Sequence, residues 1–337
     1  MSVRVGINGF GRIGRITLRT ILARCPGSVE VVAVNDLTDT HTNAHLFKYD
    51  STYGTFSGEV KAEEKDFYVN GKKITVFAER NPGDIRWDTL GIDIVIESTG
   101  RFTDATMAVL HREHGVKKVI ISAPAKNEDV TLVLGVNEEM YSPSKHHVIS
   151  NASCTTNGLA PVAKFLNDRF GIEKGLLTTV HSYTNSQALL DTAAKDLRDA
   201  RGAAQNIVPA STGAARAIGL VIPELKGKFN GMAFRVPTPT VSVVDFTALL
   251  SRDATVGEVN ATAKEYADGP MKGILEYTDL PLVSTDMKGS SFSSIYSALD
   301  TVAVGGNLVK VIAWYENEWG YSCRVADLVN FLIAKGL

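Results

Sequence analysis

The stretch VRVGINGFGRIG, residues 3–14, decides the expected fold of this chain. Its first five residues favour a short strand, and the glycine-rich run after them precedes a helical pattern of apolar side chains. Glycines in a G-x-G-x-x-G run between a strand and a helix permit a tight turn, close approach of a pyrophosphate and close helix–strand packing. Gly9, Gly11 and Gly14 therefore predict a dinucleotide site after the first strand.

The second predicted strand supports the same interpretation. Residues 29–34 are mostly apolar and end at Asn35-Asp36, which places Asp36 22 residues after Gly14. An acidic residue at about this distance accepts a hydrogen bond from a ribose hydroxyl in dinucleotide-binding proteins. A glycine turn after a strand is common by itself, so the alternative is a plain turn. The complete series of strand, glycine run, helix, strand and terminal acid favours the cofactor site.

Two more apolar strands, residues 92–97 and 118–121, indicate a parallel sheet. They end at Ser98-Thr99-Gly100 and at Ser122, whose hydroxyls can face a cofactor or serve in ordinary turns. A helix is expected between them, from residue 104 to residue 114. Repeated strand, loop and helix units are typical of a doubly wound, Rossmann-type α/β domain.

The segment from residue 37 to residue 90 departs from this simple alternation. Within it, residues 67–77 predict a hairpin, because Asn70-Gly71 suits a type I′ turn.

The alternation of apolar strands and helices ends near residue 150. A helix is expected over residues 155–170, and the strands expected beyond it are 176–180, 230–236, 240–250 and 308–314. We predict an α+β domain over residues 151–314, built on a mainly antiparallel sheet. Residues 1–150, together with a C-terminal helix in 315–337, form the predicted dinucleotide-binding domain.

Cys154 lies between a β-rich run, residues 147–149, and the helical pattern that starts near residue 155. Free backbone N–H groups and the positive end of a helix dipole would then lie beside its sulfur. Such surroundings lower the pKa of a thiol, and the thiolate is the form that attacks a carbonyl carbon. The alternative is a buried, unreactive cysteine.

Among seven histidines, His181 is the candidate base, because it ends a strand and begins a long loop over residues 186–206. The alternative is a core histidine with a satisfied hydrogen bond. The other histidines are expected on the surface: His41, His45, His111, His114, His146 and His147. Arg198 and Arg235 could neutralise phosphate groups, or could serve as a solvated loop charge and a strand-end ion pair.

Composition excludes several classes of function. The 337 residues carry 35 Lys and Arg against 37 Asp and Glu, which gives no electrostatic case for a nucleic-acid or membrane-surface partner. The apolar runs fall short of the ~20 residues of a membrane span, and residues 1–15 favour strand and turn over a signal peptide. Cys25, Cys154 and Cys323 are scattered, without metal-site or disulfide spacing. We therefore expect a cytoplasmic protein without a metal.

A nicotinamide site beside a cysteine nucleophile has a natural chemistry. The thiolate adds to an aldehyde, hydride leaves to the nicotinamide, and a thioester remains for a second nucleophile. Anion-binding residues would let that second nucleophile be phosphate.

The chain resembles the phosphorylating glyceraldehyde-3-phosphate dehydrogenases from end to end. The stretches that carry the resemblance are INGFGRIGR (7–15), KYDST (48–52), SNASCTTN (150–157), NIVPASTGAA (206–215), RVPTP (235–239) and NEWGY (317–321). Few other dehydrogenases carry even two of these motifs. The resemblance implies NAD as cofactor, a homotetramer, and a loop over residues 186–206 at a subunit interface.

The resemblance also implies roles for individual residues. Cys154 would be the nucleophile and His181 its base. One anion site would comprise Ser153, Thr155, Thr212 and Gly213, and the other Thr184, Arg198 and Arg235. The residues implied at the dinucleotide are Arg12, Ile13, Asp36, Arg80, Ser122, Asn317 and Tyr321. They add to the candidates Gly9, Gly11, Gly14, Ser98 and Thr99.

Four residues depart from the family pattern. Gly158 stands where many members have a second cysteine, which removes a possible oxidative partner of Cys154 but no catalytic group. Ser186 replaces a common Asp or Thr, and Thr192-Ala193 replaces the Leu-Pro of many bacterial NAD-preferring members. Asp36 would repel a 2′-phosphate, so we expect NAD to be preferred, while Thr192-Ala193 leaves room for some use of NADP.

The expected activity is NAD-dependent oxidation of glyceraldehyde 3-phosphate to 1,3-bisphosphoglycerate, in glycolysis or gluconeogenesis. One alternative is erythrose-4-phosphate dehydrogenase, although the run Tyr183-Thr184-Asn185 fits the triose enzyme better. A second alternative is a non-catalytic, nucleotide-responsive interaction or redox-sensing protein.

Overall fold

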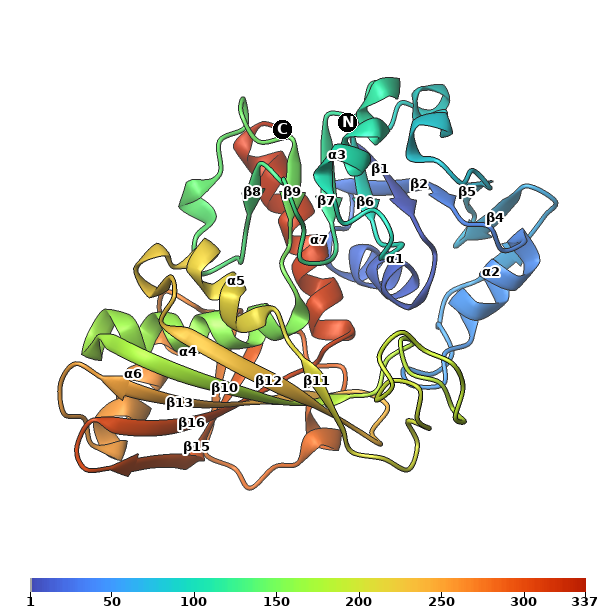
Figure 1. Cartoon of the computed structure of the whole chain (residues 1–337). Helices are drawn as coiled ribbons and strands as arrows, with labels where there is room; N and C mark the ends of the chain where they lie inside the picture. Colours follow the sequence, from blue (N-terminus) through green and yellow to red (C-terminus); the bar gives the residue numbers. More distant parts are fainter. Residues whose placement is uncertain (1) are drawn as a thin grey trace. The chain divides into compact units, whose positions relative to one another are not determined.

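The chain forms two compact units in a computed structural model that describes residues 2–337 (Figure 1). The first unit comprises the chain up to Leu132, Glu139–Ala152 and Ser322–Leu337. The second comprises Val133–Glu138 and Ser153–Tyr321. Each unit has its own β-sheet.

The first unit contains a nine-stranded sheet in the order β3-β4-β5-β2-β1-β6-β7-β9-β8. Its strands are β1 (Val3–Asn8), β2 (Val29–Asn35), β3 (Val60–Ala62), β4 (Asp66–Val69), β5 (Lys72–Phe77), β6 (Ile94–Glu97), β7 (Lys118–Ile121), β8 (Val130–Thr131) and β9 (Val148–Ser150). Its helices are α1 (Arg12–Arg24), α2 (Thr40–Lys48), α3 (Ala105–Ala108) and most of α7 (Trp319–Lys335).

Strand β1 lies at the centre of this sheet and pairs in parallel with β2 on one side and β6 on the other. The chain passes from β1 to β2 and later to β6, so the direction of winding reverses at β1. A crevice at such a switch point, outside the carboxyl ends of the strands, is where doubly wound sheets bind their ligands. The predicted Rossmann-type fold of this unit is therefore confirmed.

The predicted hairpin is also present. Strands β4 and β5 pair antiparallel and are joined by Asn70 and Gly71, with φ values of +51° and +78°. Positive φ at both central residues is the requirement of a type I′ turn.

The helix predicted from residue 104 to residue 114 differs from the prediction. Only α3 is α-helical, and a 3₁₀ helix, η3 (Val109–His114), continues it to Gly115. This segment also corrects one expectation about the histidines, because His111 is completely buried rather than on the surface. The sequence did not indicate this burial, since three polar residues directly follow His111 and its partners come from distant segments.

The second unit contains a seven-stranded sheet in the order β11-β12-β10-β13-β16-β15-β14. Its strands are β10 (Ile172–Ser182), β11 (Val208–Ser211), β12 (Phe229–Val236), β13 (Ser242–Leu250), β14 (Leu275–Thr278), β15 (Ser294–Val304) and β16 (Leu308–Tyr315). Its helices are α4 (Cys154–Phe170), α5 (Ala214–Val221) and α6 (Val256–Asp268). Four of the neighbouring pairs are antiparallel and two are parallel, as expected for a mainly antiparallel sheet.

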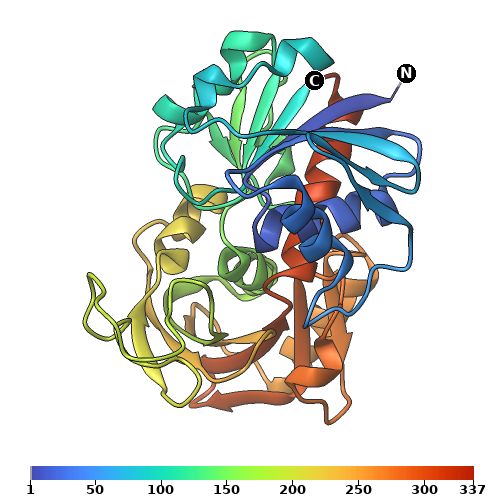
Figure 2. The same ribbon diagram turned by 90° about the vertical axis from the view of Figure 1, so that its right-hand side faces the viewer.

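Helix α4 packs against four strands of this sheet, β10, β13, β15 and β16, and also against α5 and α6. Burial along β13 alternates strictly between buried and half-buried residues, so one face of the sheet supplies the core. Between β10 and β11 the chain forms a long loop without helix or strand, drawn in yellow-green (Figure 2).

Short 3₁₀ helices complete the secondary structure of both units. They are η1 (Pro82–Asp84), η2 (Trp87–Leu90), η4 (Glu138–Met140), η5 (Pro223–Leu225) and η6 (Ser284–Met287). Across residues 2–337, no helix combines the length and the apolar character that crossing a membrane requires.

Candidate functional site

Cys154 is the first residue of α4, as its place between a strand and a helical pattern predicts. Ser153 is the N-cap, and its Oγ accepts a hydrogen bond of 2.9 Å from the backbone N–H of Thr156. A serine cap of this kind satisfies one of the unpaired N–H groups at the start of a helix. The thiol is therefore held at the positive end of a 17-residue helix.

His181 lies near the end of β10 with its Nε2 3.5 Å from Sγ of Cys154. Its Nδ1 is 2.7 Å from the backbone carbonyl oxygen of Ser182. Because a carbonyl oxygen only accepts, Nδ1 must carry the proton, and in the neutral ring Nε2 is then the acceptor. The imidazole is oriented to take a proton from the thiol.

Burial opposes charge on both members of this pair. It raises the pKa of Cys154, although the charge of Arg235 and a hydrogen bond from Thr155 act in the lowering direction. It lowers the pKa of His181 to about 3, with a further lowering by Arg235. The expectation that the helix end lowers the thiol pKa is therefore wrong for the cysteine alone, because desolvation is the larger effect.

Transfer of the thiol proton to His181 creates both charges together. At 3.5 Å the thiolate and the imidazolium attract each other, and the helix dipole favours the anion. Internal proton transfer is therefore the route by which this geometry can form a thiolate without loss of a proton to solvent.

Tyr315, the last residue of β16, was not singled out from the sequence, yet it packs beside Cys154 and His181. Its hydroxyl lies 2.8 Å from Oγ1 of Thr155 and 2.8 Å from Oγ1 of Thr179. Its ring meets the His181 ring edge to face, with 5.9 Å between centroids. An apolar run that ends in tyrosine was the only available signal.

Gly158 makes room for Tyr315 on helix α4. A Cβ at position 158 would lie 2.9 Å from Cγ of Tyr315, closer than real contacts allow. The tyrosine ring thus packs directly on the helix backbone one turn after Cys154.

Arg235 stands beside His181 because parallel pairing of β10 with β12 brings these two residues into register. Its Nη1 is 3.4 Å from the carbonyl oxygen of Ser182. The half-buried guanidinium is thus close enough to influence the pKa of both Cys154 and His181. Of the two arginines predicted to bind anions, Arg235 is the one that lies beside the pair.

The other predicted anion residues occupy two segments. Thr184 begins the long loop and shares a hydrogen bond of 2.9 Å with the hydroxyl of Ser186, while Arg198 is exposed in that loop. Thr212 and Gly213 precede α5, and Oγ1 of Thr212 accepts from the N–H of Ala214 at 3.2 Å. The space around a Cβ at Gly213 is open within 4 Å among residues 2–337.

Asn317 is buried beyond the end of β16, with its amide oriented by two serines. Its Oδ1 accepts from Oγ of Ser182 at 3.0 Å and from Oγ of Ser242 at 3.2 Å. The amide nitrogen is then the group that Asn317 can offer to a ligand carbonyl. Glu316 fixes this segment by accepting hydrogen bonds from Thr240 and from the backbone N–H of Trp319.

In the first unit, the glycines have the geometry that the motif predicts. Gly9 has φ of +88°, and a Cβ there would lie 2.6 Å from the backbone nitrogen of Thr99. A Cβ on Gly14 would lie 2.2 Å from the carbonyl oxygen of Gly9, which explains close packing of α1 on β1. At Gly11 no described atom beyond its chain neighbours comes within 4 Å of that position, so a ligand can approach the backbone.

The start of α1 fits a pyrophosphate. The helix has no side-chain cap at Gly11 and no acidic residue in its first turn. A helix start directs its backbone N–H groups and the positive end of its dipole outward, so this end of α1 can bind an anion. Arg12 and Ile13 open the helix, and Arg12 forms an ion pair of 2.6 Å with Asp50.

Asp36 follows β2, and its Oδ2 accepts from the backbone N–H of Phe10 at 2.8 Å. This contact holds the carboxylate beside the glycine-rich turn, where a ribose could reach it. Arg80 is exposed, and Tyr321 is buried in the first turn of α7.

The serines after β6 and β7 have structural partners. Ser98 Oγ donates to the carbonyl oxygen of Gly9 at 2.7 Å, and Ser122 Oγ donates to that of Glu97 at 3.0 Å. Thr99 donates from its backbone N–H and its hydroxyl to the Glu97 carboxylate. These three side chains therefore shape the edge of the sheet.

Comparison with known proteins identifies both halves of the chain. Residues 3–105 match the family model described as glyceraldehyde 3-phosphate dehydrogenase, NAD binding domain, and residues 153–317 match the corresponding C-terminal domain. The match to the NAD binding domain confirms NAD as the cofactor and agrees with the open glycine turn.

Full-length relatives support the same assignment. The glyceraldehyde-3-phosphate dehydrogenase of Geobacillus stearothermophilus is 59% identical over 337 residues, and that of Priestia megaterium is 57% identical over 337 residues. Glyceraldehyde-3-phosphate dehydrogenase 1 of Bacillus subtilis is also 57% identical over 337 residues. In all three comparisons the alignment covers 100% of both chains. The predicted relationship is confirmed: this chain is an NAD-dependent dehydrogenase and belongs to the glyceraldehyde-3-phosphate dehydrogenase family.

Proposed function

We propose that the chain oxidises D-glyceraldehyde 3-phosphate with NAD and joins the product to inorganic phosphate as 1,3-bisphosphoglycerate. The observation that carries this proposal is the pairing of Cys154 with His181, 3.5 Å apart, with the other ring nitrogen committed to a carbonyl. Such a pair can make a thiolate and can also exchange a proton with substrate oxygen.

The first half-reaction oxidises the aldehyde on Cys154. Sγ attacks the carbonyl carbon while its proton moves to Nε2 of His181, and return of a proton to oxygen completes a hemithioacetal. His181 then removes the hydroxyl proton, which drives out hydride and leaves a thioester on Sγ. NAD, when bound, supplies the hydride acceptor.

The second half-reaction releases the acyl group. A phosphate oxygen attacks the thioester carbon, the C–S bond breaks, and Cys154 leaves as a thiolate. The products are the acyl phosphate and the regenerated thiolate. Because the helix dipole and Arg235 both favour negative sulfur, they also favour this leaving group.

Two groups of residues are proposed to hold the anionic phosphates. Ser153, Thr155, Thr212 and Gly213 lie at or beside the starts of α4 and α5, which pack against each other. Helix starts supply N–H donors for anions. Arg235, with Thr184 and Arg198 from the loop after β10, is proposed for the other group, because a guanidinium binds phosphate through two parallel hydrogen bonds.

The first unit is proposed as the dinucleotide-binding domain, with the C-terminal helix, and residues 151–314 as the catalytic and oligomerisation domain. The proposed NAD contacts are Gly9, Gly11, Arg12, Ile13, Gly14, Asp36, Arg80, Ser98, Thr99, Ser122, Asn317 and Tyr321. The Asp36 carboxylate would repel the 2′-phosphate of NADP, so NAD is the proposed preference, with some use of NADP.

A homotetramer is the proposed assembly. Helix α4 packs on one face of the second sheet, and the registers of its strands place several apolar side chains on a single common face. The exposed apolar side chains on this common face are Leu176, Met232, Val302, Val304 and Leu308. Exposed apolar surface of this kind is typical of subunit interfaces. Sedimentation of the purified protein, with Leu176→Asp as a disrupting variant, tests this assembly.

None of Cys25, Cys154 and Cys323 is in a disulfide, which favours the reducing conditions of the cytoplasm as the place of action.

Initial-rate kinetics test the proposed activity. Reduction of NAD should require glyceraldehyde 3-phosphate and either phosphate or arsenate, and Cys154→Ser should lower it by ~10⁴-fold or more. NAD binding by the same variant is the control for folding. Steady turnover with water as the only acyl acceptor would contradict the proposal, and a higher rate with erythrose 4-phosphate would favour the alternative substrate.

A further inference from the structure

Three buried polar residues end the three central strands of the first sheet. Asn8 ends β1, Asn35 ends β2 and Glu97 ends β6, and strand register places Asn8 directly beside both of the others. Their exposed fractions are 1%, 4% and 2%. Buried polar side chains require partners, because an unpaired one costs free energy.

Each of these residues directly precedes a group proposed to bind the dinucleotide. Asn8 precedes Gly9, and Asn35 precedes Asp36. Glu97 precedes Ser98 and Thr99. The three buried side chains therefore lie at the switch point of the sheet. Each stands one residue before a residue proposed to contact the dinucleotide.

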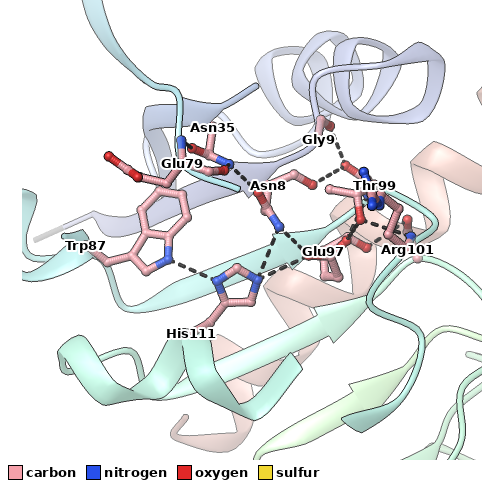
Figure 3. Close-up of polar contacts among 11 residues, drawn as sticks. Asn8, Gly9, Asn35, Glu79, Trp87, Glu97, Thr99, Arg101 and His111 are labelled. Carbon is pink, nitrogen blue, oxygen red and sulfur yellow. Dashed lines mark hydrogen bonds and ion pairs between the residues drawn. The ribbon is translucent and has the colours of Figure 1, made fainter. Parts of the chain in front are cut away.

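The partners form one continuous network, drawn in Figure 3. Asn35 Nδ2 donates to Asn8 Oδ1 at 2.7 Å, and Asn8 Nδ2 donates to Glu97 Oε2 at 2.5 Å. Asn35 also bonds to the backbone of Glu79, the residue before Arg80. Its Oδ1 accepts from the Glu79 N–H at 2.8 Å, and its Nδ2 donates to the Glu79 carbonyl oxygen at 2.9 Å. The network thus connects β2, β1 and β6 with the segment that carries Arg80.

The proton positions within this network follow from its donors. The indole N–H of Trp87 can only donate, and it lies 3.1 Å from Nδ1 of His111. Nδ1 must therefore accept, and the ring proton of neutral His111 is on Nε2, 3.1 Å from Oε2 of Glu97. His111 therefore donates a hydrogen bond to the Glu97 carboxylate.

The Glu97 carboxylate receives four donors. Two reach Oε2, from Asn8 and His111, and two reach Oε1, from the backbone N–H and the hydroxyl of Thr99. Four donors match the acceptor capacity of an ionised carboxylate. Within residues 2–337 Glu97 forms no ion pair with Lys or Arg, so these four hydrogen bonds hold the buried carboxyl group.

Displacement of the carboxylate would be transmitted to the glycine turn. Thr99 is fixed by Glu97, and the backbones of Thr99 and Gly9 are so close that a Cβ on Gly9 would lie 2.6 Å from the Thr99 nitrogen. Ser98 adds a hydrogen bond to the Gly9 carbonyl. A shift of Thr99 must therefore shift the turn.

We propose that Glu97 and His111 are positioning residues for NAD, which act on the cofactor through Thr99 and the turn at Gly9. The inference rests on the proposed placement of NAD at this turn. It adds two residues that need not touch the cofactor but decide how the turn is presented to it. Precise placement of such groups is usually secured by surrounding hydrogen bonds.

The test compares NAD affinity with stability. Glu97→Gln presents an amide that cannot accept all four donors, and His111→Leu removes the donor to Oε2. Each is expected to raise the Kd for NAD by about ten-fold, since an unpaired buried polar group costs about as much as a ten-fold change in Kd. At saturating NAD, kcat and the alkylation rate of Cys154 should change less than about two-fold.

Three comparisons make the result decisive. His111→Gln, which keeps a donor, should restore most of the affinity lost in His111→Leu. His114→Gln in the same 3₁₀ helix, whose Nε2 bonds to the Gly83 carbonyl, should leave the Kd unchanged. Val119→Ala in β7 provides a core variant of lowered melting temperature. All Kd values are measured well below each melting temperature.

Unchanged Kd in Glu97→Gln and His111→Leu, or an equal rise in Val119→Ala, would overturn the inference and leave a purely structural role. Failure of the wild-type protein to bind NAD or to turn over would instead count against the proposed function. The two failures are therefore distinguishable.

Discussion

Each of the two units buries a histidine within a polar cluster, and the two rings hold their protons on opposite nitrogens. In the second unit, His181 donates from Nδ1 to a backbone carbonyl, so Nε2 accepts and faces Cys154. In the first unit, His111 accepts at Nδ1 from Trp87, so Nε2 donates to Glu97. Burial is thus common to both, and the partner at Nδ1 decides whether a histidine can serve as a base.

Substitution of the two histidines should separate their roles most strongly. His181→Asn is expected to lower kcat by roughly 10²–10⁴-fold, because it removes the proton acceptor for the thiol. His111→Leu should leave kcat at saturating NAD nearly unchanged. Steady-state kinetics at varied NAD measure both effects, and an equal loss of kcat in the two variants would break the comparison.

Acid should destabilise the second unit through His181. Its folded pKa, about 3, is below the ordinary value of about 6.5, so the unfolded chain binds this proton first as the pH falls. The contribution of His181 to the free energy of unfolding is complete above about pH 6.5 and is lost progressively towards pH 3, by at most about 5 kcal/mol.

Urea unfolding at several pH values measures this loss. The slope of stability against pH should be smaller in His181→Gln than in the wild type. Identical slopes would mean that the buried ring is not the group that titrates.

Removal of Arg235 should change the pKa of Cys154 and that of His181. The guanidinium lowers the pKa of Cys154 and that of His181, so Arg235→Leu should raise both. The rate of Cys154 alkylation by iodoacetamide, followed against pH, reports the thiolate. Arg235→Lys, which keeps the charge, should retain most of the wild-type profile, and a profile unmoved in Arg235→Leu would contradict the electrostatic role.

The smallest effect is expected at Gly158. Alanine there is a better helix former by about 1 kcal/mol, but its Cβ would press on Tyr315, and overpacking costs about 1–3 kcal/mol. Gly158→Ala should therefore lower the free energy of unfolding slightly. Gly257→Ala in α6, where no described atom crowds the Cβ position, is the matched control and should raise it. An equal rise in the free energy of unfolding in both variants would show that Tyr315 moves aside without destabilising the protein.

Much of the fold was predictable because local rules decide it. The glycine-rich turn, the apolar parallel strands, the Asn70-Gly71 hairpin and the start of α4 at Cys154 each depend on neighbouring residues. Backbone dihedral preferences and side-chain periodicity act over such short distances. The 3₁₀ character of η3 was missed because it depends on packing rather than on local preference.

The polar clusters were less predictable, because their members come from distant parts of the chain. Tyr315 reaches Thr155 and Thr179 across more than 130 residues, and Glu97 joins Asn8 across 89. His111 was expected on the surface because the residues that follow it, Arg112 to His114, are polar. Nothing local to His111 indicates Trp87 or Glu97 as partners.

The sequence by itself determined the cofactor turn, the parallel sheet around β1, and a cysteine at the start of a helix, since contiguous residues set backbone conformation. Only the tertiary structure decided which histidine accepts a proton, because strand pairing chooses the partner of each ring nitrogen. It also decided that burial raises the pKa of Cys154, since desolvation depends on atoms packed around the sulfur from several elements.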